Sequence, residues 1–220
     1  MGSRREEIKD ALREADFGKV ARLALDDKKV FSILISLAYD KEDLLCWRAI
    51  KAMGRAAGAV AEKDPLTVRN IVHRLLWSVR EESGGVGWSA PEMLGEIVVH
   101  GPPAFADIPP IILSFHEEES FLKGVLWALG RIVHAGHNGI EGGYDVAKEA
   151  LDHKDPSVRG LALRAIPGAR IAETAEKIKG MIHDEGRFTL YENQELVETR
   201  VGYIAEKVLS RWREGGQIET

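Results

Sequence analysis

Apolar residues recur along this chain with the spacing of one face of an α-helix, and the pattern is nearly continuous. When the chain is aligned with itself, four segments match, and each carries an apolar residue followed by glycine or proline. The segments are CWRAIKAMGRAAG (46–58), GWSAPEMLGEIVV (87–99), LKGVLWALGRIVH (122–134) and RGLALRAIPGARI (159–171). The apolar–small pairs recur after 41, 35 and 37 residues. A period of this length is typical of solenoids built from paired helices.

The periodicity predicts an all-α protein with a small β-hairpin near its carboxyl end. We predict helices over residues 3–15, 18–25, 27–39, 42–57, 65–80, 89–100, 107–115, 118–134, 142–152, 156–166, 171–183 and 199–213. The stretch RFTLYENQELVETR instead alternates apolar and polar residues around a turn at 192–194, which predicts a hairpin over about 187–198. Such a hairpin would cover apolar surface that has no further repeat to meet. We expect one repeat domain over residues 1–220.

The segment DPSVRGLALRAI has features of a particular repeat type. Asp155 can cap a helix that starts at Pro156, where the missing amide hydrogen costs nothing. One apolar stripe follows, made of Val158, Leu161, Ala162, Ala165 and Ile166. The segment resembles a HEAT repeat of the short kind also found in phycobilisome-lyase-like proteins. The resemblance implies an α-α superhelix, and the lyase relationship implies that the chain handles a chromophore.

Glycines in the aligned repeats have a structural explanation. Glycine in a helix interior costs about 1 kcal/mol relative to alanine. Gly54, Gly95 and Gly130 stand at equivalent positions. We expect them to let neighbouring helices approach closely.

Composition narrows the choice of partners. The chain has 30 basic and 35 acidic residues and a formal charge of −5, which argues against a general binder of nucleic acid or anionic membranes. Cys46 is the only cysteine, so the chain forms no intrachain disulfide and no thiolate-rich metal site. The amino-terminal MGSRREEIKD lacks the apolar region of a signal peptide. We therefore expect a cytoplasmic protein without a cofactor.

The segment REESGGVGWSAPEMLGE, residues 80–96, combines glycines, a tryptophan and several acids. As a functional site it would be an acidic pocket for a cation or for a basic group of a partner. The candidate binding residues are Glu81, Glu82, Trp88, Glu92 and Glu96.

The same segment also has a structural interpretation. Ser89 and Glu92 fit a capping box at the start of a helix. Glu96 aligns with Arg55 of the preceding repeat and Arg131 of the following one, so these three side chains would form a charge ladder across stacked helices. The sequence leaves both interpretations open.

Other residues give weaker indications. His134 and His137 stand where a helix is expected to end, and a metal there would need further ligands. Trp77 and Trp127 lie in apolar stripes and are expected first in the core, with an aromatic surface for a partner as the second interpretation. Trp212, between arginines, is expected to be partly exposed. We find no Ser-His-Asp or Cys-His catalytic motif.

The sequence favours a scaffold that binds a protein or peptide on the concave face of the repeat array. A first alternative is a lyase-like or small-ligand-binding enzyme subunit, which requires an enclosed pocket with convergent polar groups. A second is nucleic-acid binding along a basic concave face, which requires arginines gathered on one side. The residues that would have to gather are Arg48, Lys51, Arg55, Arg69, Arg74, Arg131, Arg159, Arg164 and Arg170.

Overall fold

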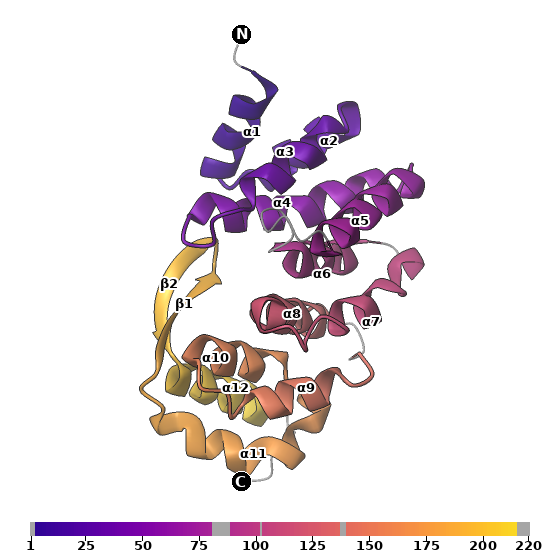
Figure 1. The fold of residues 1–220 in the computed structure, drawn as a ribbon. Coiled ribbons are helices and arrows are strands. Elements are labelled where there is room, and N and C mark those ends of the chain that lie inside the picture. Colours follow the sequence, from indigo (N-terminus) through magenta and orange to yellow (C-terminus); the bar gives the residue numbers. More distant parts are fainter. Residues whose placement is uncertain (1–2, 81–88, 102, 137–139, 215–220) are drawn as a thin grey trace. The chain divides into compact units, whose positions relative to one another are not determined.

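A computed structural model of the protein describes residues 3–80, 89–101, 103–136 and 140–214 (Figure 1). These residues form α-helices, short 3₁₀ helices and one antiparallel hairpin, which confirms the predicted all-α class with its small hairpin. The chain divides into two compact units, Met1–Ile112 and Leu113–Thr220. A single repeat domain over the whole chain stays a prediction.

Paired helices make up the first unit. They are α1 (Arg4–Arg13), α2 (Phe17–Asp26), α3 (Lys29–Leu37), α4 (Leu44–Ala61), α5 (Pro65–Arg80), α6 (Ala90–His100), the 3₁₀ turn η2 (Pro103–Phe105) and most of α7 (Ile108–Leu113). Aspartates cap several of them, because a carboxylate there accepts an otherwise unpaired amide hydrogen. Asp16 accepts from the Lys19 amide at 2.8 Å and Asp43 from the Leu45 amide at 2.9 Å. Helix α4 is central and packs on α2, α6, α3 and α5.

Two glycines bring α4 and α6 into close contact. A Cβ atom on Gly54 would lie 2.5 Å from the carbonyl oxygen of Glu96, and one on Gly58 would lie 2.5 Å from that of His100. From the first contact to the second, the position moves four residues toward the carboxyl end in both helices. The two helices therefore run parallel, as equivalent helices of successive repeats do. The predicted helix 42–57 was therefore too short: Gly58 is a second packing glycine, and α4 continues through it to Ala61.

Helix α10 is central to the second unit, where it packs on both α8 and α12. The elements are α8 (Glu119–His134), α9 (Gly143–Ala150), α10 (Pro156–Ala165), η3 (Gly168–Arg170), α11 (Ile171–Gly180), η4 (Met181–His183), β1 (Arg187–Glu192), β2 (Glu195–Arg200) and α12 (Val201–Glu214). The predicted start of α10 is confirmed, because Asp155 accepts from the Ser157 amide at 2.8 Å. The predicted apolar stripe from Val158 to Ile166 is buried. Gly130 of α8 again faces backbone, 3.3 Å from the Arg164 carbonyl oxygen.

The hairpin has the predicted turn. Asn193 and Gln194 have φ of 51° and 69°, and Glu192 pairs with Glu195 across them. Positive φ at both central residues is the geometry of a type I′ turn, whose twist suits a two-residue hairpin. Strand β1 packs on α10, where the Phe188 ring occupies the space that a Cβ on Gly160 would need.

Stacked, equivalent helices in each unit confirm the HEAT-like resemblance as a helical-repeat fold. The relationship to phycobilisome lyases stays a prediction. Within the described residues, no helix has both the length and the apolar character to cross a bilayer.

Substituting Gly54 by alanine tests the close helix contact. The added methyl group must push α6 away, so Gly54→Ala should lower the free energy of unfolding by about 1–3 kcal/mol, despite the better helix propensity of alanine. Gly18→Ala is the matched control in α2, because a Cβ there meets nothing closer than 3.4 Å. Chemical denaturation measures both variants, and equal stability of the two would contradict the contact.

Candidate functional site

The acidic segment singled out in the sequence lies partly within the described structure. Glu81, Glu82 and Trp88 fall outside the described residues. Ser89, Glu92 and Glu96 belong to the start and the body of α6.

Glu96 is buried against α4 and paired with a lysine. Its side chain is 0% exposed, and both carboxylate oxygens accept from Lys51 Nζ, at 2.8 and 2.9 Å. His100, one turn later in α6, places Nδ1 3.5 Å from the same carboxylate. The sequence alignment predicted Arg55 of the preceding repeat as the partner of Glu96. The observed partner is Lys51, which lies one helical turn earlier in α4. Arg131 belongs to the second unit, so that step of the ladder stays a prediction.

Glu92 forms a second buried ion pair. Its side chain is 1% exposed, and Oε1 lies 2.5 Å from Lys41 Nζ. Among the described residues, Glu92 Oε2 and Ser89 Oγ have no hydrogen-bond partner. Ser89 does occupy the N-cap position of α6, but its side chain accepts no capping bond. The predicted capping box is therefore wrong, because the Glu92 carboxylate is directed at Lys41 instead.

These two ion pairs favour the structural interpretation of the acids on α6. Glu92 pairs with Lys41, which precedes α4, and Glu96 pairs with Lys51, which belongs to α4. Both carboxylates are buried. Binding of a partner by Glu81, Glu82 and Trp88 stays a prediction.

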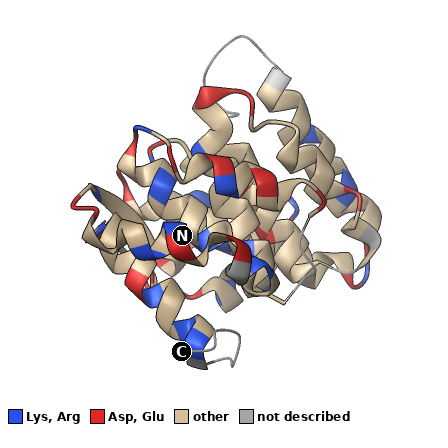
Figure 2. Ribbon diagram, turned by 90° about the horizontal axis from the view of Figure 1, so that it is seen from below, with Lys and Arg blue, Asp and Glu red and all other residues tan. Residues whose placement is uncertain are grey.

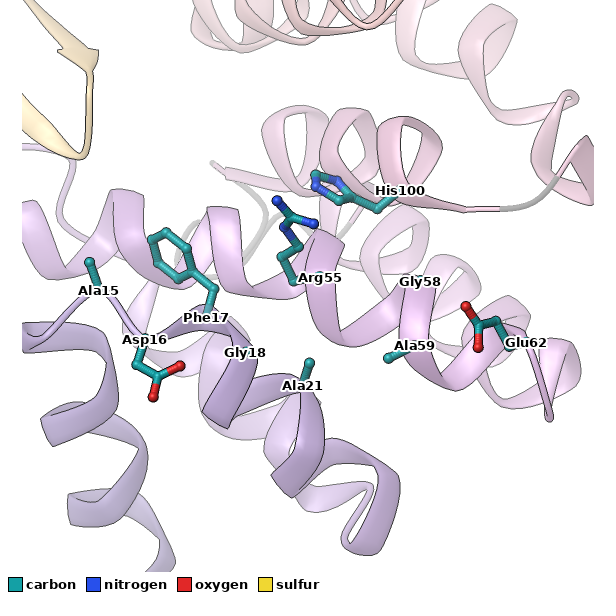
Figure 3. A pocket seen from close by; sticks show the side chains of 10 residues that line it. All are labelled: Ala15, Asp16, Phe17, Gly18, Ala21, Arg55, Gly58, Ala59, Glu62 and His100. Carbon is teal, nitrogen blue, oxygen red and sulfur yellow. The ribbon is translucent and has the colours of Figure 1, made fainter.

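An open groove crosses the exposed side of α2 and α4 and ends at α6 (Figure 3). Its volume is about 500 Å³, and we call it the α2–α4 groove. It is lined by Ala15 and Asp16 before α2, by Phe17, Gly18 and Ala21 of α2, by Arg55, Gly58 and Ala59 of α4, by Glu62 at the C-cap of α4, and by His100 of α6. The predictions from the sequence do not include this groove, because its walls come from three separate stretches of the chain.

Charged groups in the α2–α4 groove differ in whether they are paired. Asp16 accepts from the Lys19 amide and lies 3.9 Å from Arg22 Nη2. Arg55 and Glu62 are exposed, and neither makes a hydrogen bond or ion pair with the described residues. A cation and an anion on one helix face are therefore available to an external group.

His100 adds no charge to the groove at neutral pH. Its Nδ1 must carry the hydrogen, because it lies 3.1 Å from the Glu96 carbonyl oxygen, which can only accept. Burial lowers the pKa of His100 below its ordinary value and outweighs the opposite effect of Glu96. Arg55, whose side chain lies beside the ring in Figure 3, lowers this pKa further. The ring is therefore neutral near pH 7, and the charge of Arg55 has no partner there.

Cys46 is buried in α4 and is not poised for nucleophilic chemistry. Burial, followed by the charge of Glu92, raises the pKa of the thiol to about 12. Thiolates are the reactive form, and reactive cysteines have a lowered pKa. The thiol is therefore packed as a small apolar group.

Among the remaining candidates, His134 is engaged within the second unit. Its Nδ1 lies 2.7 Å from the Gly130 carbonyl oxygen, and Nε2 accepts from Arg211 at 3.2 Å. Trp127 is buried, as predicted. Trp77 is 69% exposed and Trp212 only 7%, so both of those predictions were wrong: Trp77 lies on the outer side of α5, and Trp212 on the inner side of α12.

No protein-family model matches the chain, and no curated protein matches it significantly. Similar solved structures include the archaeal HEAT-like repeats protein from Thermococcus onnurineus NA1, with 14% identity and a TM-score of 0.41, covering 99% of this chain and 100% of that chain. An engineered protein has 17% identity and a TM-score of 0.46, covering 100% and 96%. A designed armadillo repeat protein has 15% identity and a TM-score of 0.42, covering 96% and 95%.

Removing Lys51 tests the buried pair. Lys51→Met leaves the Glu96 carboxylate inside without its ammonium partner, and we expect the free energy of unfolding to fall by about 3 kcal/mol. The double variant Lys51→Met with Glu96→Leu should recover most of that loss, because it leaves no buried charge. Arg13→Met is the control; it breaks an exposed pair with Asp10 and should cost less than about 1 kcal/mol. Equal losses for Lys51→Met and Arg13→Met in urea titrations would show that the buried pair has no special role.

The raised thiol pKa predicts slow alkylation of Cys46. At about pH 8, near the ordinary thiol pKa, the folded protein should react with iodoacetamide at least tenfold more slowly than the denatured chain. Mass spectrometry of quenched samples measures the rate. Equal rates in the two states would contradict the burial of the thiol.

Proposed function

We propose that this chain is a helical-repeat scaffold that binds a protein or peptide on the exposed side of helices α2, α4 and α6. The observation that carries the proposal is the α2–α4 groove, which is open, is lined by helices of successive repeats and contains Arg55 and Glu62, two charges that no described residue pairs. An open groove of about 500 Å³ suits a polypeptide segment. A cytoplasmic location, expected from the single cysteine, belongs to the same proposal.

The groove gives less support to an enzyme subunit that handles a small ligand. A small-molecule site encloses its ligand and directs a few polar groups at one point. In the groove, Arg55 and the C-cap residue Glu62 are separated by about two helical turns, so they do not converge. The buried thiol of Cys46 offers no nucleophile to such a site.

Nucleic-acid binding is less well supported because acids neutralise most of the candidate cations. Salt bridges join Lys51 to Glu96, Arg69 to Asp107, Arg159 to Asp184, Arg164 to Glu192 and Arg170 to Glu173. Acidic and basic residues are also interspersed along the helices in Figure 2. Phosphate binding needs cations that are free of such partners and gathered on one side.

A substitution that fills the groove tests the proposed function. Ala59→Arg places a long side chain between α2 and α4 and should reduce partner recovery from an extract of the native host at least tenfold. Asn70→Arg is the matched control, because it adds the same side chain at an exposed position of α5 outside the groove. Quantitative mass spectrometry of proteins retained by each immobilised variant gives the readout, after circular dichroism has shown both to be folded. Unchanged recovery by folded Ala59→Arg would refute the groove as the binding surface.

A further inference from the structure

We propose that the occupant of the α2–α4 groove is an extended peptide in the polyproline II conformation, with an acidic and a basic residue three positions apart. The acidic side chain binds Arg55, and the basic side chain binds Glu62. This inference rests on the proposed function and specifies the chemistry of the partner.

Charge complementarity identifies the two anchoring groups. Among the charged residues of the groove, Asp16 is engaged by the Lys19 amide and Arg22, and His100 is neutral near pH 7. Nearby Lys51 is held by Glu96. Arg55 and Glu62 are therefore the groups that gain from an external counter-charge. A guanidinium pairs best with a carboxylate, which can accept two parallel hydrogen bonds from it.

The spacing of the anchors fits a peptide in the polyproline II conformation. Arg55 lies in α4, and Glu62 is the C-cap residue of this helix and keeps a helical backbone conformation. The two residues are seven positions apart, which places them on one face of the helix about 10 Å apart. A polyproline II peptide has three residues per turn and rises about 3.1 Å per residue, so positions i and i+3 share a side about 9 Å apart. In a β-strand, residues i and i+3 point to opposite faces.

The floor between the anchors suits the same ligand. Gly58 and Ala59 lie between Arg55 and Glu62 along the chain and line the groove, so α4 itself contributes only small residues there. Phe17 and Ala21 of α2 form the opposite wall (Figure 3). Grooves that bind polyproline II peptides characteristically offer aromatic and apolar walls to the proline rings.

Fluorescence anisotropy with short labelled peptides tests the inference. The probe is Pro-Glu-Pro-Pro-Arg-Pro, and the comparison peptides carry two glutamates or two arginines at the same positions. The wild-type protein should bind the mixed-charge probe about tenfold more tightly than either comparison peptide, because like charges facing each other oppose binding. Arg55→Glu should shift the preference to the doubly basic peptide, and Glu62→Arg to the doubly acidic one.

Control variants connect these preferences to the groove. Arg13→Glu makes the same charge change as Arg55→Glu on α1, outside the groove, and should keep the wild-type preference. Ala59→Arg should weaken the binding of all three peptides. Circular dichroism shows whether each variant is folded.

The outcomes separate this inference from the proposed function. Equal affinities of the wild type for all three peptides, or folded charge variants that do not switch preference, would overturn the acid–base occupant. If Ala59→Arg nevertheless abolishes partner recovery, the groove remains a binding surface for another kind of polypeptide. If recovery is unchanged, the proposed function itself fails.

Discussion

The close contact between α4 and α6 determines the arrangement of the first unit. Gly54 and Gly58 let two parallel helix backbones approach to a distance that any side chain would prevent. At that distance Glu96 is enclosed, and its charge must be matched from α4, where Lys51 supplies the ammonium group. The glycines and the ion pair therefore depend on each other. The glycines allow the close contact that buries Glu96, and the Lys51 ammonium group offsets the energetic cost of burying that charge.

Burial of the acids on α6 also decides where a partner can bind. Glu92 and Glu96 hold lysines and fix the position of α6 against the neighbouring helix. A buried ion pair adds little net stability over an apolar contact, but it penalises a shifted alignment that would leave a charge unpaired. On the exposed side, Arg55 and Glu62 have no such partner among the residues that the structure describes. Helix α4 thus carries two kinds of charge: Lys51 pairs with a buried acid of the fold, whereas Arg55 is available to a ligand.

Periodicity predicted the helices and the hairpin because those patterns are local. The partners and the exposure of individual side chains depend on how the helices pack, so local patterns do not predict them. Glu96 aligned with Arg55, yet it meets Lys51, and Trp77 lies in an apolar stripe yet faces outward. The groove joins residues near 16, 58 and 100, which only the packed helices bring together. The sequence did contain one indication of the groove charges. Arg55 and Glu62 have no opposite charge three or four residues away, so neither can form an ion pair along its own helix face.

Where the hairpin packs on α10, one pair of residues has complementary sizes. Phe188 fills the space above Gly160, and no side chain larger than hydrogen fits beneath its ring. These two positions are far apart in the chain but are bound to change together during evolution. A descendant sequence that acquires a larger residue at position 160 must first, or simultaneously, lose the aromatic ring at position 188.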